Sequence, residues 1–305
     1  MTSVFLIILA VIAIIFIILT ALVCRIILNI FLNISITTAR DDHPDVPGED
    51  VMFPSEDGVT LHGKFIPARG KAKKTIVFCH EVGAGSGSWY KYISFLPEAG
   101  YNIFTFDFRG HGSSHSTNGY APNQWFSHYE VHDFNGALDY VLSRPEVADK
   151  EVGVVGISRG GAVAVYCAAQ RKEIRAIVMD SAFSTYETLF DYISRWACVY
   201  LPVKGIHPWP NHYLSTISLI LAQIKLRHRL PRMERRLKQL QIPLFFIHGE
   251  RDSYIPVDQA HRLFAMAKEP KQLLTVPKAR HNESVVVQPD TYKKRVMSFF
   301  SEYLP

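Results

Sequence analysis

The sequence predicts an α/β protein: a mostly parallel sheet with helices on both faces, a helical insertion and one separate helix at the N-terminus. Two observations support this prediction. From residue 50 to 182, and again after residue 240, apolar runs of strand length alternate with segments of helical length. The start of the chain differs, because Val4 to Val23 is twenty residues long and contains no charge. The 305 residues, 48% of them hydrophobic, suffice for one large α/β domain and an appendage.

Residues 1–36 are expected to anchor the chain in a membrane. As a helix, Val4 to Val23 would be about 30 Å long, which matches the hydrocarbon thickness of a bilayer. A cleaved signal peptide is the alternative, but no Lys or Arg precedes Arg25 and no small-x-small cleavage site follows the apolar run. Apolar residues continue to Ile36, and three polar residues spaced by four predict an interfacial extension with one polar stripe: Arg25, Asn29 and Asn33.

The flanking charges predict the orientation of this anchor. The N-terminal side of the apolar run carries only the α-amine, whereas Arg25, Arg40 and further basic residues follow it. The positive-inside rule therefore predicts a single-pass anchor with the folded domain in the cytoplasm. The cysteines agree with a reducing compartment, because no pair has the spacing of a disulfide or a zinc site, and buried thiols are expected at Cys24, Cys79, Cys167 and Cys198.

A linker and the first part of the folded core follow the anchor. The polar segment 37–49 contains two prolines and a glycine and is predicted to be the linker. The core segment 50–182 opens with a hairpin, since Ser55-Glu-Asp-Gly58 separates two strand-like runs, Val51–Phe53 and Thr60–Ile66. The next elements alternate as a parallel sheet requires, with strands at Lys74–His80 and Tyr101–Phe106 and helices at Trp89–Ala99 and Glu130–Ser143.

The segment Val152 to Ala169 contains the strongest functional signal. An apolar, β-branched strand ends at Ile157, a helix of small residues follows, and Gly156-Ile-Ser-Arg-Gly160 lies between them. Between a strand and a helix, the pattern G-x-S-x-G places the serine on a sharp, strained turn, and the glycines let the two elements approach closely. Ser158 would then expose its hydroxyl as a nucleophile, and the amide of Arg159 would point toward an oxyanion formed there.

A serine nucleophile needs a base and an acid that orients the base. Both should follow later strands, in the order serine, acid, histidine. The strand-like run Ile242–His248 is followed by Asp252, and the run Gln272–Val276 is followed by His281. We therefore predict Asp252 as the acid and His281 as the base. Asp180, which follows an earlier strand, is the alternative acid, but Asp252 is favoured because it comes in a G-x-x-D turn directly after its strand.

Five motifs are spread over residues 50–305: His80-Glu-Val-Gly83, Asp107-Phe-Arg-Gly-His-Gly-Ser113, the turn at Ser158, His248-Gly-Glu-Arg-Asp252 and His281-Asn282. Together they resemble the serine α/β-hydrolases of the serine-aminopeptidase-like and membrane-anchored group. The resemblance implies the α/β-hydrolase fold, a catalytic set of Ser158, Asp252 and His281, and a structural role for the turn that begins at Asp107. It also implies a second oxyanion amide after His80, for which Val82 is the candidate.

Glu81 departs from the pattern of this group, because it replaces the usual glycine beside the second oxyanion donor. Its carboxylate could repel anionic substrates, hold a loop or face solvent. The departure bears directly on the donor geometry of Val82.

A cap insertion is expected at residues 183–240, where the alternation of strands and helices stops, and the second part of the core would follow at 241–305. Two cap helices are predicted, Tyr186–Tyr200 and Tyr213–Lys225. Residues 225–238 then hold seven Lys or Arg and one acidic residue, in a chain of net charge +5. This segment is either a solvated helical face or a basic patch on anionic lipid. No nucleic-acid-binding signature accompanies it, so nucleic acid is not an expected partner.

The sequence therefore predicts a membrane-anchored serine hydrolase that cleaves lipophilic carboxylic esters or thioesters through an acyl-enzyme on Ser158. The substrate would be a small molecule or a lipid, and neither a cofactor nor a metal is expected. His128 and His132 lie one helical turn apart, but no carboxylate or cysteine set completes a metal site. Two alternatives stay open: a serine peptidase or aminopeptidase, with Glu187 as the candidate amine-binding carboxylate, and a non-catalytic binding protein, which Glu81 would favour.

Overall fold

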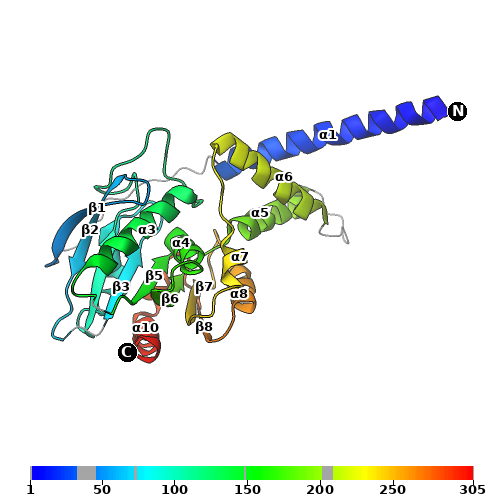
Figure 1. The fold of residues 1–305 in the computed structure, drawn as a ribbon. Helices are drawn as coiled ribbons and strands as arrows, with labels where there is room; N and C mark the ends of the chain where they lie inside the picture. The colour runs from blue at the N-terminus through cyan, green and yellow to red at the C-terminus, as the bar shows by residue number, and fades with distance from the viewer. Residues whose placement is uncertain (1, 33–45, 72–73, 148, 201–208, 305) are drawn as a thin grey trace. The chain divides into compact units, whose positions relative to one another are not determined.

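The computed structural model describes residues 2–32, 46–71, 74–147, 149–200 and 209–304. The chain divides into two compact units (Figure 1). The smaller unit comprises residues 1–35 and 186–230, and the larger comprises residues 36–185 and 231–305. The sheet belongs to the larger unit and the N-terminal helix to the smaller.

Eight strands form one sheet in the larger unit, in the order β1-β2-β4-β3-β5-β6-β7-β8. β1 is antiparallel to β2, β2 is antiparallel to β4, and the other neighbouring pairs are parallel. The strands are β1 (Glu49–Pro54), β2 (Thr60–Ile66), β3 (Lys74–Cys79), β4 (Tyr101–Phe106), β5 (Val152–Ile157), β6 (Ile174–Asp180), β7 (Leu244–Gly249) and β8 (Lys271–Val276). This sheet confirms the predicted fold class, and its strands differ from the predicted ones by at most two residues at either end.

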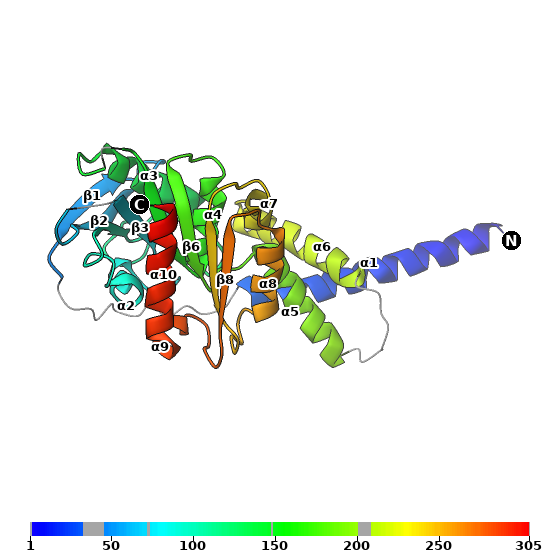
Figure 2. The same ribbon diagram turned by 90° about the horizontal axis from the view of Figure 1, so that it is seen from below.

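Helices cover both faces of the sheet. They are α2 (Trp89–Ile93), α3 (His128–Ser143), α4 (Arg159–Ala168), α7 (Met233–Leu237), α8 (Val257–Met266), α9 (Ser284–Val287) and α10 (Pro289–Tyr303), with a short 3-10 turn η1 (Ser86–Ser88). Successive residues of a strand point to opposite faces. In β5, Val154 therefore joins the core formed with α3, α4, α7 and α8, whereas Val155 joins the core formed with α2 and α10. Figure 2 shows α10 lying across this second face.

The described part of the smaller unit contains the helices α1 (Thr2–Leu32), α5 (Thr185–Tyr200) and α6 (Trp209–Leu226). Among the described residues, α1 is the one helix long and apolar enough to cross a membrane, with a mean hydropathy of 3.5 and no burial of its most apolar window. Its C-terminal end is different, because Cys24, Ile27 and Phe31 lie on one face and are buried. α6 contacts α1 and also packs on α5, where the rings of Phe190 and His212 stack with centroids 4.2 Å apart.

The helix predicted at Trp89–Ala99 is wrong in its length. α2 ends at Ile93, and turns follow, in which Leu96 N–H donates to Ile93 O at 2.9 Å. Pro97 explains the early end, because proline has no N–H to donate and disfavours helical backbone at the residue before it.

The basic segment 225–238 is not one helical face. α6 ends at Leu226, Pro231 follows, and α7 begins at Met233. The first three basic residues of the segment belong to the smaller unit and the last four to the larger unit. Several further predictions fall outside the described residues: the polar stripe position Asn33, the end of the anchor extension, most of the linker, and the side chain of Cys198.

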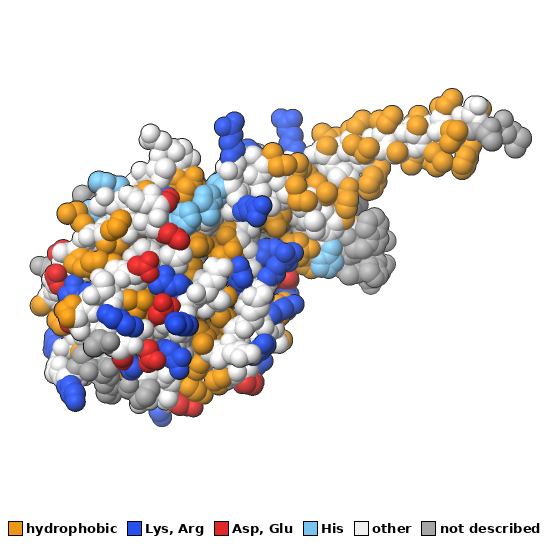
Figure 3. All heavy atoms as spheres, viewed as in Figure 1, with side chains coloured by type: hydrophobic (Ala, Val, Ile, Leu, Met, Phe, Trp, Pro, Cys, Tyr) orange, Lys and Arg blue, Asp and Glu red, His pale blue; other side chains and the backbone are white. Residues whose placement is uncertain are grey.

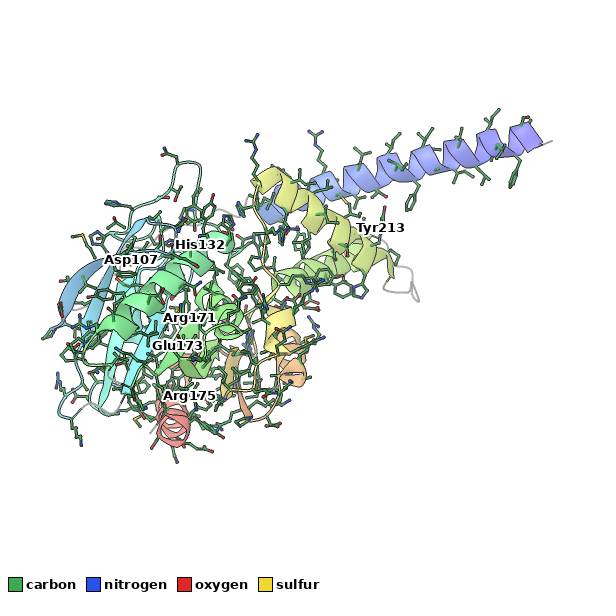
Figure 4. All side chains as sticks on the ribbon, in the orientation of Figure 1. Asp107, His132, Arg171, Glu173, Arg175 and Tyr213 are labelled. Atoms are coloured by element: carbon green, nitrogen blue, oxygen red, sulfur yellow. The ribbon has the colours of Figure 1, made fainter. Side chains whose placement is uncertain are left out.

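The turn that begins at Asp107 braces the larger unit (Figure 4). Asp107 Oδ1 accepts a hydrogen bond from Ser86 N–H at 2.5 Å, and its Oδ2 accepts one from Ser113 N–H at 3.0 Å. Arg109 is fully buried, and its guanidinium lies 2.7 Å from Asp133 Oδ1 and 2.6 Å from Asp57 Oδ1. This fork of charge-assisted hydrogen bonds joins the turn to α3 and to the β1–β2 hairpin.

Asp133→Ala should lower the free energy of unfolding by about 3–5 kcal/mol, because it leaves the Arg109 guanidinium buried without a partner on that side. Glu98→Ala is the matched control. It breaks the ion pair of Arg69 and Glu98, whose side chains are 76% and 55% exposed, and such pairs are worth about 0–1 kcal/mol. Urea unfolding followed by tryptophan fluorescence measures both, and equal losses in the two variants would contradict a bracing role for Asp133.

Candidate active site

Ser158 lies on the turn between β5 and α4, with φ 51° and ψ −116°. A positive φ is strained for a serine and persists because the surrounding structure fixes it. The turn is tight: a Cβ at Gly156 would lie 2.5 Å from Gly161 Cα, and a Cβ at Gly160 would lie 2.3 Å from Cys79 O. Glycine is therefore required where α4 begins against β5 and β3, and this close approach presents the serine above the sheet.

The structure brings Ser158, His281 and Asp252 together. Ser158 Oγ lies 2.9 Å from His281 Nε2, and His281 Nδ1 lies 2.6 Å from Asp252 Oδ2. The Asp252 side chain is fully buried, whereas the His281 side chain is 18% exposed. With Nδ1 protonated and donating to Asp252, Nε2 is left as the acceptor for the serine proton. The three side chains thus have the geometry of a nucleophile, a base and an orienting acid.

Hydrogen-bond donors surround the Asp252 carboxylate. Its Oδ1 accepts from the backbone N–H groups of Tyr254, at 2.9 Å, and Ile255, at 2.8 Å. Its Oδ2 accepts from His281 and lies 3.3 Å from His248 Nε2. Burial by itself would raise the pKa of Asp252, but the hydrogen bonds from His248 and His281 hold this pKa below its ordinary value. Asp252 therefore stays ionised at neutral pH and can stabilise a protonated His281.

His248 is a member of this site whose role the sequence did not reveal. It is 1% exposed, and its Nε2 lies 2.9 Å from Ile255 O. Since a carbonyl oxygen only accepts, Nε2 carries a hydrogen, which is shared between Ile255 O and Asp252. One feature of the sequence could have indicated this role: His248 lies four residues before Asp252, at the end of the strand that leads into the turn.

The loops that carry the acid and the base are tied together. Arg251 N–H donates to Ala279 O at 2.9 Å. A Cβ at Gly249 would lie 2.5 Å from the same carbonyl oxygen, so the end of β7 needs a glycine for the two loops to approach. Lys91 Nζ donates to Asn282 O at 2.9 Å, which joins the residue after the histidine to α2. These contacts hold His281 at a fixed place beside Asp252.

Two backbone amides are the predicted donors to an oxyanion beside Ser158. Arg159 is the first residue of α4, so its N–H has no intrahelical acceptor. The second predicted donor belongs to the loop after β3. This loop lies against the serine turn, as a Cβ at Gly160 would be only 2.7 Å from His80 O. The predicted donors Arg159 and Val82 therefore come from two segments that the fold places side by side.

His80 sets the orientation of the Glu81–Val82 peptide. Its Nδ1 lies 2.6 Å from Glu81 O, and its Nε2 accepts from Phe108 N–H at 3.1 Å. Burial lowers the pKa of His80 to about 3, so the ring is neutral and Nδ1–H is the donor. In a planar trans peptide the N–H points away from the C=O, so Val82 N–H points away from His80. No backbone acceptor for this N–H occurs in the described part of the chain.

The Glu81 carboxylate does not stand free in solvent. Tyr92 Oη donates to Oε1 at 2.9 Å, and Ser88 Oγ donates to Oε2 at 3.2 Å. Of the three roles considered from the sequence, these contacts support the second, in which Glu81 holds its loop, here against η1 and α2.

The Arg159 side chain is fully buried and joins the serine turn to α3. Its Nη1 donates to Asn123 O at 2.8 Å and lies 3.2 Å from Glu130 Oε1, while its Nη2 lies 3.2 Å from His111 Nε2. Glu130 also completes a capping box with Ser127 at the start of α3. Burial would raise the pKa of Glu130, but Arg159 and the hydrogen bonds hold it below its ordinary value. A buried ion pair therefore fixes the backbone of the proposed oxyanion donor.

Asp180 is not the hydrogen-bond partner of His281. It is fully buried, its Oδ1 accepts from Ser181 Oγ at 3.0 Å and from Ser284 Oγ at 3.3 Å, and its backbone O accepts from Ser158 N–H at 2.7 Å. Burial raises the pKa of Asp180 to about 6. The geometry therefore favours Asp252 as the acid and gives Asp180 a structural position beneath the serine turn.

The remaining candidates considered from the sequence are two histidines of α3 and the cysteines. The rings of His128 and His132 are 5.6 Å apart at the start of α3. Within the described ranges, no cluster of three or more His, Cys, Asp or Glu side chains is arranged to hold a metal ion. Cys79 and Cys167 are buried and free, and burial raises the pKa of both thiols.

Asp180→Asn should raise the free energy of unfolding more at pH 8 than at pH 4. The pKa of Asp180 is about 6 in the folded protein, above its ordinary value of 3.8, so wild type loses stability as the pH rises between these values, whereas a neutral Asn does not. About two pKa units correspond to a difference of up to about 3 kcal/mol. Urea unfolding at both pH values measures it, with Asp50→Asn, whose side chain is 83% exposed, as the control. An equal change in the free energy of unfolding at both pH values would contradict a raised pKa of Asp180.

Comparison with known proteins relates part of the chain to one family. The profile of the family described as "alpha/beta hydrolase fold" matches residues 74–198. An uncharacterized protein of Escherichia coli O157:H7, YfhR, is 29% identical over 262 residues, which cover 82% of this chain and 80% of the relative.

Solved structures agree with this assignment. The Pyrococcus furiosus esterase Pf2001 has a TM-score of 0.62 and 24% identity, over 85% of this chain and 94% of that one. An esterase of Exiguobacterium antarcticum has a TM-score of 0.58 and 16% identity, over 83% of this chain and 100% of that one. Together with the eight-stranded sheet and the serine turn, these similarities show that the chain has the α/β-hydrolase fold.

Proposed function

We propose that this protein is a serine hydrolase that cleaves carboxylic esters or thioesters and is anchored in a membrane by α1. The observation that carries the proposal is the unbroken series of contacts from Ser158 Oγ through His281 to Asp252, at 2.9 and 2.6 Å. Its similarity in fold to two esterases supports the reaction class. The strongly apolar α1, which would keep the enzyme beside lipid, supports a lipophilic substrate.

The reaction follows from the order of these contacts. Ser158 Oγ attacks the substrate carbonyl carbon while His281 Nε2 takes the hydroxyl proton, and Asp252 stabilises the resulting imidazolium. The amides of Arg159 and Val82 donate to the negatively charged oxygen of the tetrahedral intermediate. When the intermediate collapses, His281 gives its proton to the leaving alcohol or thiol, and an acyl-enzyme remains on Ser158.

The second half of the reaction frees the enzyme. His281 takes a proton from water, the resulting hydroxide attacks the acyl carbon, and the same two amides stabilise the second tetrahedral intermediate. Its collapse releases the carboxylic acid, and the proton on His281 returns to Ser158 Oγ. Every proton transfer passes through His281 Nε2, so no other acid or base is needed.

The remaining parts of the proposal concern location. α1 is taken as an uncleaved anchor with the hydrolase in the cytoplasm, because Arg25 and later basic residues follow the apolar run. The insertion at residues 183–240 is proposed to be the cap of the site. An apolar cap beside a membrane anchor would suit acylglycerols, lysolipids or acylated proteins.

Ser158→Ala should abolish turnover of p-nitrophenyl esters, with a loss of at least about 10⁴-fold in kcat, because no other hydroxyl contacts His281 in the described part of the chain. The assay uses full-length protein in detergent with acyl chains from two carbons upward, so that the preferred chain length also sizes the acyl site. Wild type should label with a fluorophosphonate probe, and the variant should not.

Ser143→Ala is the matched control, because this serine is exposed at the end of α3. It should retain both turnover and labelling. A wild-type protein that neither labels nor hydrolyses any ester would contradict the proposal and favour a binding role, and turnover of an aminoacyl anilide in place of esters would favour a peptidase.

Asp252→Asn should lower kcat by about 10⁴-fold with little change in KM, because an amide cannot hold His281 in the required tautomer or stabilise its cation. Asp180→Asn should retain most of the activity, since Asp180 makes no hydrogen bond to His281. Steady-state kinetics of the two variants decide between the acids, and a greater loss in Asp180→Asn would reverse the assignment.

A further inference from the structure

α6 has one face that the rest of the structure leaves uncovered. Ile220, Leu221 and Ile224 are 47%, 36% and 68% exposed. Their spacing places them on one side of the helix, while Ser218 and Ala222 on the other side are buried. Three large aliphatic side chains that are exposed together on one helix face mark a contact surface rather than ordinary surface variation.

This face is continuous with α1. The rings of Phe16 and Tyr213 have centroids 6.0 Å apart, and Tyr213 lies beside α1 in Figure 4. On α1, Leu22 and Ile26 are 53% and 62% exposed. Figure 3 shows hydrophobic side chains along α1 that continue onto the surface of α6. Both helices belong to the smaller unit, so they present one joint apolar surface.

The length of α1 places the start of α6 near the edge of the hydrocarbon core of a bilayer. A bilayer's hydrocarbon core takes about 20 residues of helix. Counted from Ser3, the core ends near Leu22, so Phe16 lies about 9 Å inside its boundary at a rise of 1.5 Å per residue. Tyr213, whose ring lies 6.0 Å from that of Phe16, then has a similar depth, just inside the edge of the hydrocarbon core. Interfacial helices bury their apolar faces to about 5–10 Å, which agrees with this depth.

Basic residues follow the apolar face directly. Lys225, Arg227 and Arg229 are all exposed. The chain contains no Asp or Glu from Trp209 to Leu230, so nothing acidic within this stretch neutralises them. An apolar helix face next to a cluster of Lys and Arg is complementary to a bilayer that carries anionic headgroups.

We propose that α6 is an interfacial helix that lies on an anionic bilayer beside the embedded part of α1. Ile220, Leu221 and Ile224 insert among the acyl chains, and the basic cluster of Lys225, Arg227 and Arg229 contacts the headgroup phosphates. The inference rests on the proposed membrane anchor. It adds a second membrane contact, so that the smaller unit is held against the lipid surface along α6 and not only tethered to it by α1.

The test places an environment-sensitive NBD label at Ile224→Cys in the full-length chain, reconstituted into vesicles of phosphatidylcholine and phosphatidylglycerol. Cys24, Cys79 and Cys167 are buried and should not label, and Cys198 is replaced by serine. The emission of the label should shift to shorter wavelength, and lipids with brominated acyl chains should quench it. Circular dichroism checks that the labelled protein is folded.

Two further label positions make the result specific. Ile12→Cys, in the middle of α1, reports on the anchor itself and should be quenched. Met52→Cys is matched for exposed hydrophobic character, since Met52 is 67% exposed on β1 of the larger unit, and it should keep the emission of a label in water. Replacing the three residues of the basic cluster by Gln should reduce the quenching at Ile224 in anionic vesicles and leave the quenching at Ile12 unchanged.

The outcomes separate the two proposals. If the label at Ile12 is quenched while the label at Ile224 behaves like that at Met52, α1 is an anchor but α6 is not interfacial, and the inference is overturned. If neither Ile12 nor Ile224 is quenched, the anchor itself fails. A label at Ile224 that is protected from water but not quenched by brominated lipid, with protection that rises with the protein-to-lipid ratio, would mean that a second copy of the chain covers the face, which also overturns the inference.

Discussion

The close approach of α4 to β5 and β3 is the constraint on which the rest of the site depends. It requires glycine at 156 and 160, because a Cβ at either position would overlap neighbouring backbone. It also forces Ser158 to a positive φ, which projects the hydroxyl above the sheet while the first amide of α4 remains unpaired within the helix. The buried Arg159 side chain, bound to Glu130 and His111, then prevents this strained turn from relaxing.

The acid and the base depend on a second close approach, between the loops after β7 and β8. Neither loop is regular structure, yet backbone hydrogen bonds and the absence of a side chain at Gly249 keep them in contact. Within them, Asp252 accepts from two backbone N–H groups and two histidines, so desolvation does not neutralise it. The cation expected on His281 during turnover thus meets a carboxylate that is already ionised and oriented.

The buried charged side chains of this protein have two kinds of surroundings. Arg109 and Arg159 are fully buried beside carboxylates, so each joins segments that are distant in sequence. Asp180 is equally buried, and burial raises its pKa to about 6, although the hydrogen bond from the Ser181 hydroxyl opposes this shift. Two aspartates that follow the neighbouring strands β6 and β7 therefore differ. Histidines hold the pKa of Asp252 below its ordinary value, whereas burial raises the pKa of Asp180.

The sequence by itself determined the strands, the apolar helix and the candidate residues Ser158, Asp252 and His281, because strand periodicity, hydropathy and the G-x-S-x-G turn are local properties of the chain. The tertiary structure decided what depends on residues far apart in sequence. It paired His281 with Asp252 rather than Asp180, gave Glu81 a partner in α2, and assigned His248 to the carboxylate. It also divided the basic segment at Pro231 and left one face of α6 uncovered. Local pattern cannot contain this information, since hydrogen-bond partners and burial arise only when separate loops and helices meet.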